Sequence, residues 1–117
     1  MIKIALVGGI GSGKSYLAKL FNYPIFDADL EVARIYKKDK NFFINLKKKL
    51  NDYSFSFPVK KSEIKKCILH KKNNLKYITK IIHPLIRKKL DSFIKKNKKS
   101  KIVILDIPLY LENKLNK

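Results

Sequence analysis

Residues 8–15 read "GGIGSGKS", and this octet contains all four glycines of a 117-residue chain. The octet fits the pattern G-x-x-x-x-G-K-[ST] of a phosphate-binding loop. Glycine reaches backbone conformations with positive φ, so successive N–H groups can wrap closely around an anion. A chain this poor in glycine keeps it where a side chain would block a phosphate group. The sequence therefore predicts a nucleotide phosphate site at this loop.

The flanking residues supply the context that such a loop needs. The apolar run "IKIALV" at 2–7 predicts a buried strand that ends at the loop. Leu17, Leu20 and Phe21 share one face of a helix expected directly after it. The positive end of that helix dipole would point at the bound phosphates.

Two further strands and several helices are expected downstream. The residues before Asp27 predict a very short strand near 24–26. The run "IVILD" at 102–106 is continuously apolar up to its acid, which is typical of a central parallel strand over about 102–105. Helical periodicity fills the segment between these strands. We expect an α/β fold with a short parallel sheet, formed as a single domain over 1–117 with a helical insert at about 37–96.

The charge balance is strongly basic, with 28 Lys and Arg against 9 Asp and Glu, a formal net charge of +19. Lys, Asn, Ile, Phe and Tyr are abundant, and their codons are AT-rich. We therefore interpret the lysines as the product of an AT-biased genome and as the solvated faces of helices. Nucleic acid is not the partner we expect, because the lysines are spread along the chain and do not form one stripe.

The expected location is the cytoplasm. One cysteine, Cys67, excludes an internal disulfide and lies on an apolar helical face. The N-terminal run "MIKIALVGG" is too short for a signal peptide, and no apolar run approaches the roughly 20 residues of a membrane helix. We expect a soluble protein without a membrane partner.

The phosphate loop also assigns ATP and Mg²⁺ as expected cofactors. Lys14 would reach the β- and γ-phosphates as a catalytic residue, and the Ser15 hydroxyl would ligate Mg²⁺. Asp106 ends the apolar run at 102–106 and is expected to hold Mg²⁺ directly or through water, with a cap before Pro108 as the alternative. The expected ATP-binding residues are Gly8, Gly9, Ile10, Gly11, Ser12, Gly13, Lys14, Ser15 and Tyr16.

The chain has only two arginines, Arg34 and Arg87. A planar guanidinium binds a phosphate or a carboxylate in two places at once, which lysine cannot do. We expect both arginines to contact an anionic substrate. The alternative for each is a surface or interhelical ion pair.

Four stretches occur in a fixed order: "GGIGSGKS", "FDADLEVAR" (26–34), "IIHPLIRKKL" (81–90) and "VILDIPLYLE" (103–112). Together they resemble the dephospho-CoA kinase family over nearly the whole chain. The resemblance implies a P-loop NTPase-type three-layer sandwich. It also implies ATP-dependent phosphorylation of the ribose 3′-hydroxyl of dephospho-CoA. Another small-molecule P-loop kinase, or an inactive or partial ATP-binding remnant, stays open as an alternative.

Two acids follow the second predicted strand, at the sheet edge where such folds bind ligands. By the resemblance Asp29 is the catalytic base and a substrate contact, and Asp27 supports it. The alternative for Asp29 is a helix N-cap. His83 either hydrogen-bonds the substrate or caps a helix.

Members of this family are typically longer than this chain. The resemblance implies that the absent part supplies two more parallel strands, a lid helix with arginines and most of the adenine site. Without them, the strand at 2–7 would present an unpaired apolar edge. We therefore expect either self-association or a partner chain that completes the sheet, and the activity of the chain stays open.

Overall fold

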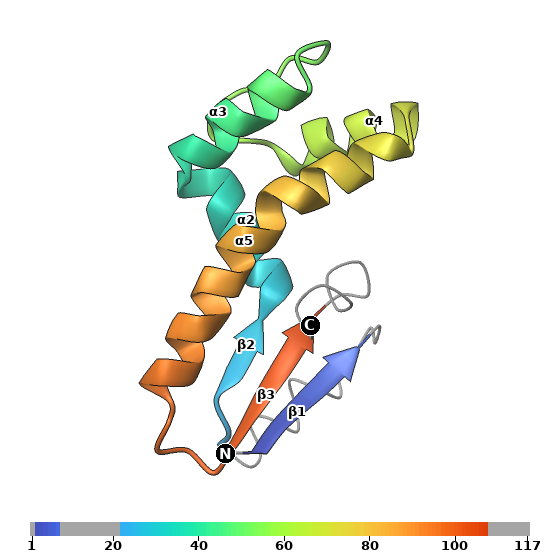
Figure 1. The fold of residues 1–117 in the computed structure, drawn as a ribbon. Helices are drawn as coiled ribbons and strands as arrows, with labels where there is room; N and C mark the ends of the chain where they lie inside the picture. Colours follow the sequence, from blue (N-terminus) through green and yellow to red (C-terminus); the bar gives the residue numbers. More distant parts are fainter. Residues whose placement is uncertain (1, 8–21, 108–117) are drawn as a thin grey trace. The chain divides into compact units, whose positions relative to one another are not determined.

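The computed structural model describes residues 2–7 and 22–107 (Figure 1). The phosphate loop, the helix predicted after it and the segment from Pro108 onward lie outside the described residues. The chain divides into two compact units, which are treated separately below. The sheet unit comprises residues 1–29 and 86–117, and the helical unit comprises residues 30–85.

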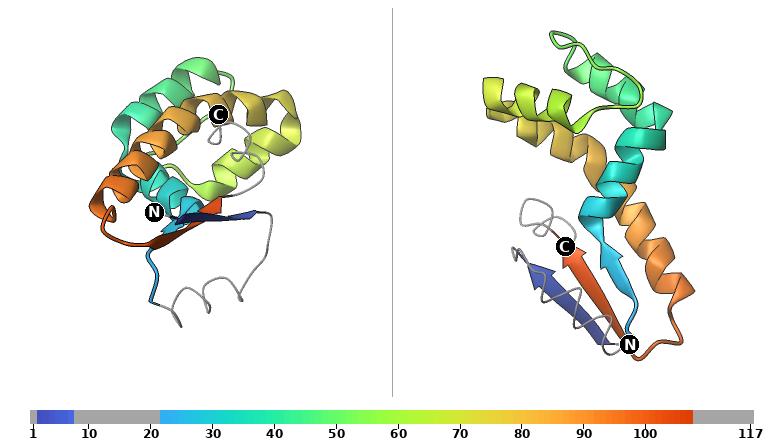
Figure 2. Two further views of the ribbon diagram at one scale, coloured as in Figure 1. Left: turned by 60° about the horizontal axis from the view of Figure 1, so that its bottom comes forward. Right: turned by 180° about the vertical axis from the view of Figure 1, so that it is seen from behind.

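The sheet unit contains a three-stranded parallel sheet. Its strands are β1 (Ile2–Val7), β2 (Ile25–Asp27) and β3 (Ile102–Ile107). The order is β1-β3-β2, so β3 lies between β1 and β2, as the right-hand view of Figure 2 shows. Ile2 pairs with Ile102 at one end of the β1–β3 ladder, and Val7 pairs with Ile107 at the other.

The central strand is buried along most of its length. Val103, Ile104, Leu105 and Ile107 are all buried, although they alternate between the two faces of the sheet. A parallel strand covered on both faces needs a continuous apolar run instead of an alternating pattern, and "IVIL" supplies it. The ring of Phe26 on β2 contacts that of Phe93 at 5.5 Å between centroids, which packs β2 against the helix that contains Phe93.

The strand β1 lies at one edge of this three-stranded order. Within the described residues it pairs with β3 alone. Ile2 is 60% exposed and Ile4 is 40% exposed. These two residues point to the same side of the strand, because side chains alternate along it. Among the described residues, this edge strand therefore has two exposed apolar side chains on one face.

The helical unit begins with the helices α2 (Ala28–Lys38), whose first two residues belong to the sheet unit, and α3 (Lys40–Lys49). Asp39 separates them and caps α3, because its Oδ1 accepts a hydrogen bond from the Phe42 backbone N–H at 2.9 Å. Phe42 and Leu46 are fully buried, four residues apart on one face. The Phe42 ring stacks on Tyr36 of α2 with 5.4 Å between centroids.

The helices α4 (Lys61–His70) and α5 (Asn73–Lys96) complete the described elements. Ile64 and Cys67 face the core from α4, as the sequence predicts for Cys67. Ser62 has the residue type of a helix cap, so the sequence predicts that it caps this helix; this is wrong, because α4 begins at Lys61 and Ser62 lies inside its first turn. Buried Ile78, Ile82, Ile86 and Leu90 recur every four residues along α5.

The helix α5 continues through Pro84 and does not end there. Proline has no N–H, so the usual hydrogen bond from position 84 back to the carbonyl of Lys80 is missing. The sequence predicts a kink or a restart at this proline, and the restart is wrong. The apolar series on both sides of Pro84 keeps one period, which explains why a single helix spans it.

The predicted fold class, α/β with a short parallel sheet and a helical insert, is confirmed. The predicted strand at 2–7 matches β1, and the other two predicted strands lie within one or two residues of β2 and β3. A single domain with its insert at 37–96 stays a prediction. Of the helices described, none combines the length and the apolarity needed to cross a membrane.

Candidate active site

The carboxyl ends of the three strands form the edge of the sheet at which Asp27 and Asp106 lie. All three strands are parallel, so they end on the same side of the sheet. The strand β1 ends at Val7, and the phosphate-loop sequence starts at the next residue. Val7 pairs with Ile107, so the carboxyl ends of β1 and β3 lie side by side.

Two carboxylates lie in one row of the sheet at this edge. Asp27 on β2 and Asp106 on β3 are Cα partners in the parallel register. Residues paired in this way point to the same face and lie about 5 Å apart. Leu6 of β1 is the partner of Asp106 on its other side, two residues before the phosphate-loop sequence begins. Both carboxylates are half-buried.

Asp29 lies two residues after Asp27, in the helix that directly follows β2. The strand β2 ends at Asp27, and α2 begins at Ala28, which is fully buried. Asp29 is therefore exposed in the first turn of α2, where the helix dipole favours the ionised carboxylate. The alternative that Asp29 is the N-cap is wrong, because it lies inside the helix.

The two arginines occur in different surroundings. Arg34 of α2 donates from Nη1 to Glu31 Oε1 at 2.7 Å, one helical turn earlier. The Arg34 side chain is 55% exposed and that of Glu31 is 16% exposed, so the glutamate is the more firmly enclosed partner. The ion-pair alternative thus applies to Arg34, although the pair lies within one helix. Arg87 is half-buried on α5.

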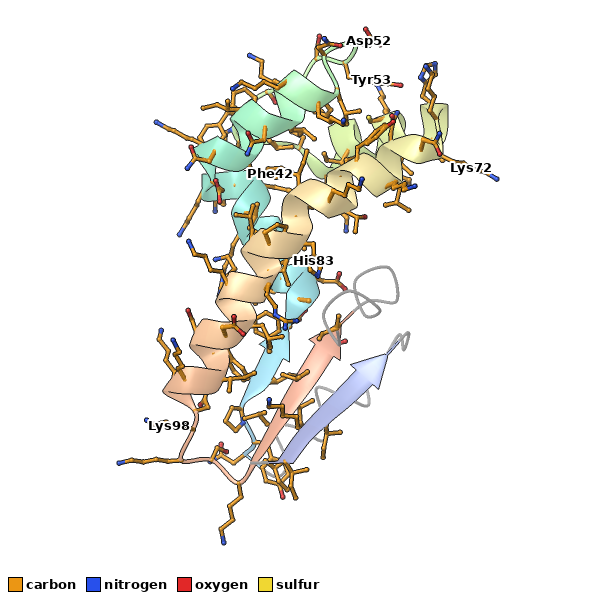
Figure 3. The ribbon with its side chains drawn as sticks, viewed as in Figure 1. Phe42, Asp52, Tyr53, Lys72, His83 and Lys98 are labelled. Atoms are coloured by element: carbon orange, nitrogen blue, oxygen red, sulfur yellow. The ribbon has the colours of Figure 1, made fainter. Side chains whose placement is uncertain are left out.

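His83 precedes Pro84 in the middle of α5, as Figure 3 shows. Its alternative role as a helix cap is therefore wrong. The Nε2 atom of His83 is buried and has no hydrogen-bond partner among the described residues. A buried polar atom of this kind carries a desolvation cost unless a ligand or water satisfies it. This observation favours a ligand-binding role over a purely structural one.

Glu63 is an organising residue that sequence reasoning missed. Its carboxylate accepts hydrogen bonds from the Lys60 backbone N–H at 3.0 Å, the Ser56 N–H at 3.1 Å and the Ser56 hydroxyl at 3.1 Å. Burial alone would raise the pKa of Glu63, but these hydrogen bonds outweigh it and hold that pKa below its ordinary value. Glu63 therefore fixes the segment before α4 to the first turn of that helix.

A second polar cluster joins α4 and α5 inside the helical unit. Asn74 donates from Nδ2 to the carbonyl of Cys67 at 2.8 Å and to the Tyr53 hydroxyl at 3.0 Å. The same hydroxyl hydrogen-bonds His70 Nδ1. Because Asn74 uses the Tyr53 oxygen as an acceptor, the phenol O–H is left to donate to Nδ1 of His70. This network accounts for the buried Asn74 without a ligand.

Comparisons with known proteins agree with one another along almost the whole chain. A family model described as "Dephospho-CoA kinase" matches residues 2–117. A dephospho-CoA kinase of Wolbachia sp. subsp. Brugia malayi is 33% identical over 118 residues, covering 97% of this chain and 60% of that protein. The corresponding protein of Wolbachia pipientis wMel is 34% identical over 116 residues, again covering 60% of its length.

One solved structure has the same fold. The crystal structure of TT1252 from Thermus thermophilus superposes with a TM-score of 0.75 and 27% sequence identity. The match covers 97% of this chain and 59% of that one. The chain thus spans about 60% of the length of the relatives that it matches.

Proposed function

The chain belongs to the dephospho-CoA kinase family, and on this basis we propose that it phosphorylates dephospho-CoA with ATP and Mg²⁺. The ribose 3′-hydroxyl oxygen attacks the γ-phosphorus of ATP, and the bond from that phosphorus to the β–γ bridging oxygen breaks. The hydroxyl proton passes to a carboxylate, and ADP and coenzyme A are the products. The observation that carries this proposal is the family match over 2–117.

The nucleotide half of the proposed site consists of the loop residues Gly8 to Tyr16 and Asp106. Lys14 would neutralise charge on the β- and γ-phosphates. The hydroxyl of Ser15 and the carboxylate of Asp106 are hard oxygen ligands, which suit Mg²⁺. When bound, Mg²⁺ supplies charge neutralisation on the phosphates. The pairing of Asp106 with Leu6 supports this assignment, because Leu6 lies two residues before the loop sequence begins.

The acceptor half of the proposed site depends on Asp29 as the base. An ionised carboxylate can orient the ribose hydroxyl and accept its proton in the transition state. The exposure of Asp29 in the first turn of α2 supports this role, since its oxygens can reach a substrate. Asp27 lies beside Asp106 in register and is proposed as the supporting carboxylate.

The substrate dephospho-CoA would be held by Arg34, Arg87 and His83. A substrate phosphate would compete with Glu31 for the Arg34 guanidinium, whose 55% exposure leaves donors accessible. The buried Nε2 atom of His83 would gain the hydrogen-bond partner that it lacks among the described residues. These three assignments are proposals that binding measurements can separate.

The experiment is a product assay on the purified chain. The protein is incubated with ATP, Mg²⁺ and dephospho-CoA, and coenzyme A is quantified by chromatography, with Lys14→Ala as the matched inactive control. Formation of coenzyme A by the wild type alone is the expected result. Product from nucleoside monophosphates, but not from dephospho-CoA, would instead identify another small-molecule kinase.

ATP binding without turnover is the second candidate function. The observation that favours it is the phosphate-loop sequence at 8–15, which ATP binding alone would also explain. Calorimetric binding of ATP together with no coenzyme A product would establish it. Self-association, or a partner chain that completes the sheet, stays a prediction supported by exposed Ile2 and Ile4 on β1. Location in the cytoplasm also stays a prediction.

A further inference from the structure

Three side chains from separate parts of the helical unit meet in one hydrogen-bonded cluster. Tyr53 comes from the segment between α3 and α4, His70 is the last residue of α4, and Asn74 lies in the first turn of α5. Tyr53 is 17 residues from His70 and 21 residues from Asn74 in the sequence. The cluster therefore joins the segment 51–60 to both of the helices that follow it.

The direction of the hydrogen bonds is set first at Asn74, which is 4% exposed. Its side-chain nitrogen lies 2.8 Å from the carbonyl oxygen of Cys67. A carbonyl group only accepts hydrogen bonds, so Nδ2 and not Oδ1 is the atom that faces Cys67. The second hydrogen of Nδ2 goes to the Tyr53 hydroxyl at 3.0 Å. The Tyr53 oxygen is thus an acceptor in this cluster.

The direction of the last bond then follows. A phenol has a single O–H, and Nδ1 of His70 is the acceptor that the cluster offers to it. Nδ1 can accept only with a free lone pair, so the hydrogen of the imidazole lies on Nε2. The two rings also meet edge to face, with 5.6 Å between their centroids. The hydrogen bonds therefore run in one direction, from Asn74 through Tyr53 to His70.

We propose that these three residues form a pH-sensitive latch, which holds the segment 51–60 on α4 and α5 while Nδ1 of His70 is unprotonated and loosens when it gains a proton. A protonated Nδ1 is a donor. It would face an oxygen that already accepts from Asn74, and the phenol proton would have to turn out of the cluster. The O–H···N bond is then lost.

The charged groups around the latch are mostly cations. Figure 3 shows Tyr53 and Lys72 at the same end of the helical unit. Protonation of His70 adds one more positive charge here, so repulsion between like charges acts together with the loss of the hydrogen bond. From the elements around the latch, the charged residues nearest in sequence are Lys49 of α3, Asp52, Lys66 of α4, Lys71, Lys72 and Lys76 of α5.

Two other titratable groups of α4 keep one charge state near neutral pH. Burial raises the pKa of the Cys67 thiol, so this group stays uncharged. Hydrogen bonds from Ser56 and Lys60 outweigh burial and hold the pKa of Glu63 below its ordinary value, so this group stays ionised. A change in the latch between about pH 5 and 8, where imidazole ordinarily titrates, is therefore not due to either group.

A cluster with a purely structural role makes a different prediction from a latch. In the structural case, removal of the imidazole acceptor loosens the segment by the same factor at every pH. In the latch, protonation and substitution of His70 remove the same hydrogen bond. The substitution then has an effect near neutral pH and loses it in mild acid.

The experiment measures amide hydrogen exchange by NMR on the full chain at about pH 7.5 and about pH 5.5, on either side of the ordinary titration of imidazole. The reporters are the backbone N–H groups of Tyr53, Lys71 and Asn74, which bond to the carbonyls of Leu50, Cys67 and Lys71. The Asp39 N–H, bonded to the Ile35 carbonyl, reports on opening outside the latch. Each rate is corrected for the intrinsic exchange at that pH.

Two variants test the latch, and a third is the matched control. His70→Phe keeps an aromatic ring and removes Nδ1, whereas Tyr53→Phe removes the hydroxyl that both partners use. The chain has two histidines, so His83→Gln removes the other imidazole and leaves the latch intact. A long-range proton–nitrogen spectrum of the wild type identifies which ring nitrogen of His70 carries the hydrogen.

The spectrum should show hydrogen on Nε2 of His70 near neutral pH. At about pH 7.5 the reporter amides should exchange about 2- to 10-fold faster in His70→Phe than in wild type, the range that one neutral hydrogen bond supplies. At about pH 5.5 that ratio should fall to about 1, because the wild type has lost the same bond. Tyr53→Phe should exchange faster at both pH values, since Asn74 also loses an acceptor. The Asp39 amide should stay constant, and His83→Gln should behave as wild type.

Three outcomes overturn the proposal. One is a hydrogen on Nδ1 of His70 near neutral pH, which would reverse the bond to Tyr53. Another is a His70→Phe ratio that is the same at both pH values, which would leave a structural cluster without a switch. The third is the loss of the pH dependence in His83→Gln, which would assign it to the other histidine.

Discussion

Asp27 and Asp106 face each other across neighbouring parallel strands as Cα partners. Two carboxylates this close repel each other when both are ionised, unless a cation or a hydrogen-bond donor lies between them or nearby. Their row is one residue from the end of β3, at the edge where β1 also ends. Asp106, one residue before the end of β3, and Asp27, the last residue of β2, therefore lie side by side at one edge of the sheet.

Removing the charge of Asp106 should weaken the use of Mg²⁺ if this carboxylate holds the ion. Asp106→Asn is expected to raise the Mg²⁺ concentration for half-maximal coenzyme A formation by about 10-fold or more. A magnesium titration of initial rates measures it. Asp91→Asn changes an exposed acid of α5 and is the matched control. If Asp106→Asn leaves the magnesium titration unchanged, Asp106 does not bind the ion.

Asp29 should matter for the chemical step. Asp29→Ala is expected to lower kcat by about 10²- to 10⁴-fold, because a positioned base contributes this much to proton transfer. Single-turnover kinetics with saturating dephospho-CoA measure the effect. Asp27→Ala is expected to lower kcat by a smaller factor. If the wild type makes coenzyme A and Asp29→Ala is unimpaired, another residue is the base.

Arg34 has a partner in its own helix, so its role can be tested by comparing two variants. Arg34→Lys is expected to raise the KM for dephospho-CoA by about 10-fold, since lysine loses the planar fork. Glu31→Gln is expected to change only the free energy of unfolding, by about 0.2–1 kcal/mol for an exposed pair. If Arg34→Lys leaves the KM unchanged, Arg34 does not contact the substrate and serves only in the ion pair with Glu31.

Glu63 should make the helical unit sensitive to acid. The folded-state pKa of Glu63 lies below its ordinary value, so the ionised carboxylate stabilises the fold above that ordinary value. This contribution disappears as the pH falls through the lowered pKa. Glu63→Gln should therefore be less stable than wild type at pH 7, with the difference vanishing in acid. Urea unfolding at a series of pH values tests this, with exposed Asp52→Asn as the control. A difference that stays constant with pH would contradict it.

Phe42 is the largest fully buried side chain of the described core. Phe42→Ala would remove its contacts with the core and its stacking on Tyr36, leaving a cavity. The expected loss is about 3–5 kcal/mol of unfolding free energy. Ile44→Ala on the same helix, where the side chain is 46% exposed, should cost less than about 1 kcal/mol. Chemical denaturation of both variants compares them, and similar losses would contradict the assigned core.

Two of the strands could be predicted because each corresponds to one continuous stretch of apolar residues. "IKIALV" and "IVILD" are continuous apolar runs, which a buried parallel strand requires. The register of Asp27 with Asp106 could not be predicted, because it joins residues far apart in the chain. The position of β3 between β1 and β2 likewise depends on packing that a single sequence pattern does not encode.

Polar positions were less predictable than apolar ones. Ser62 has the residue type of an N-cap, yet α4 begins one residue before it and Glu63 supplies the hydrogen bonds instead. The cap position itself is Lys60, whose side chain has no acceptor, so the usual pattern gave no signal. His83 could be singled out from its motif, but its buried Nε2 atom is visible only in the structure.

The edge of β1 also determines how the protein should behave in solution. Its exposed Ile2 and Ile4 would favour edge-to-edge pairing of β1 with the β1 strand of another molecule, whereas a charge of +19 on every molecule opposes their approach. Added salt screens that repulsion over distances beyond about 8–10 Å and leaves the apolar edge unchanged. Colloidal stability should therefore decline as ionic strength rises, and light scattering across a salt series would follow it.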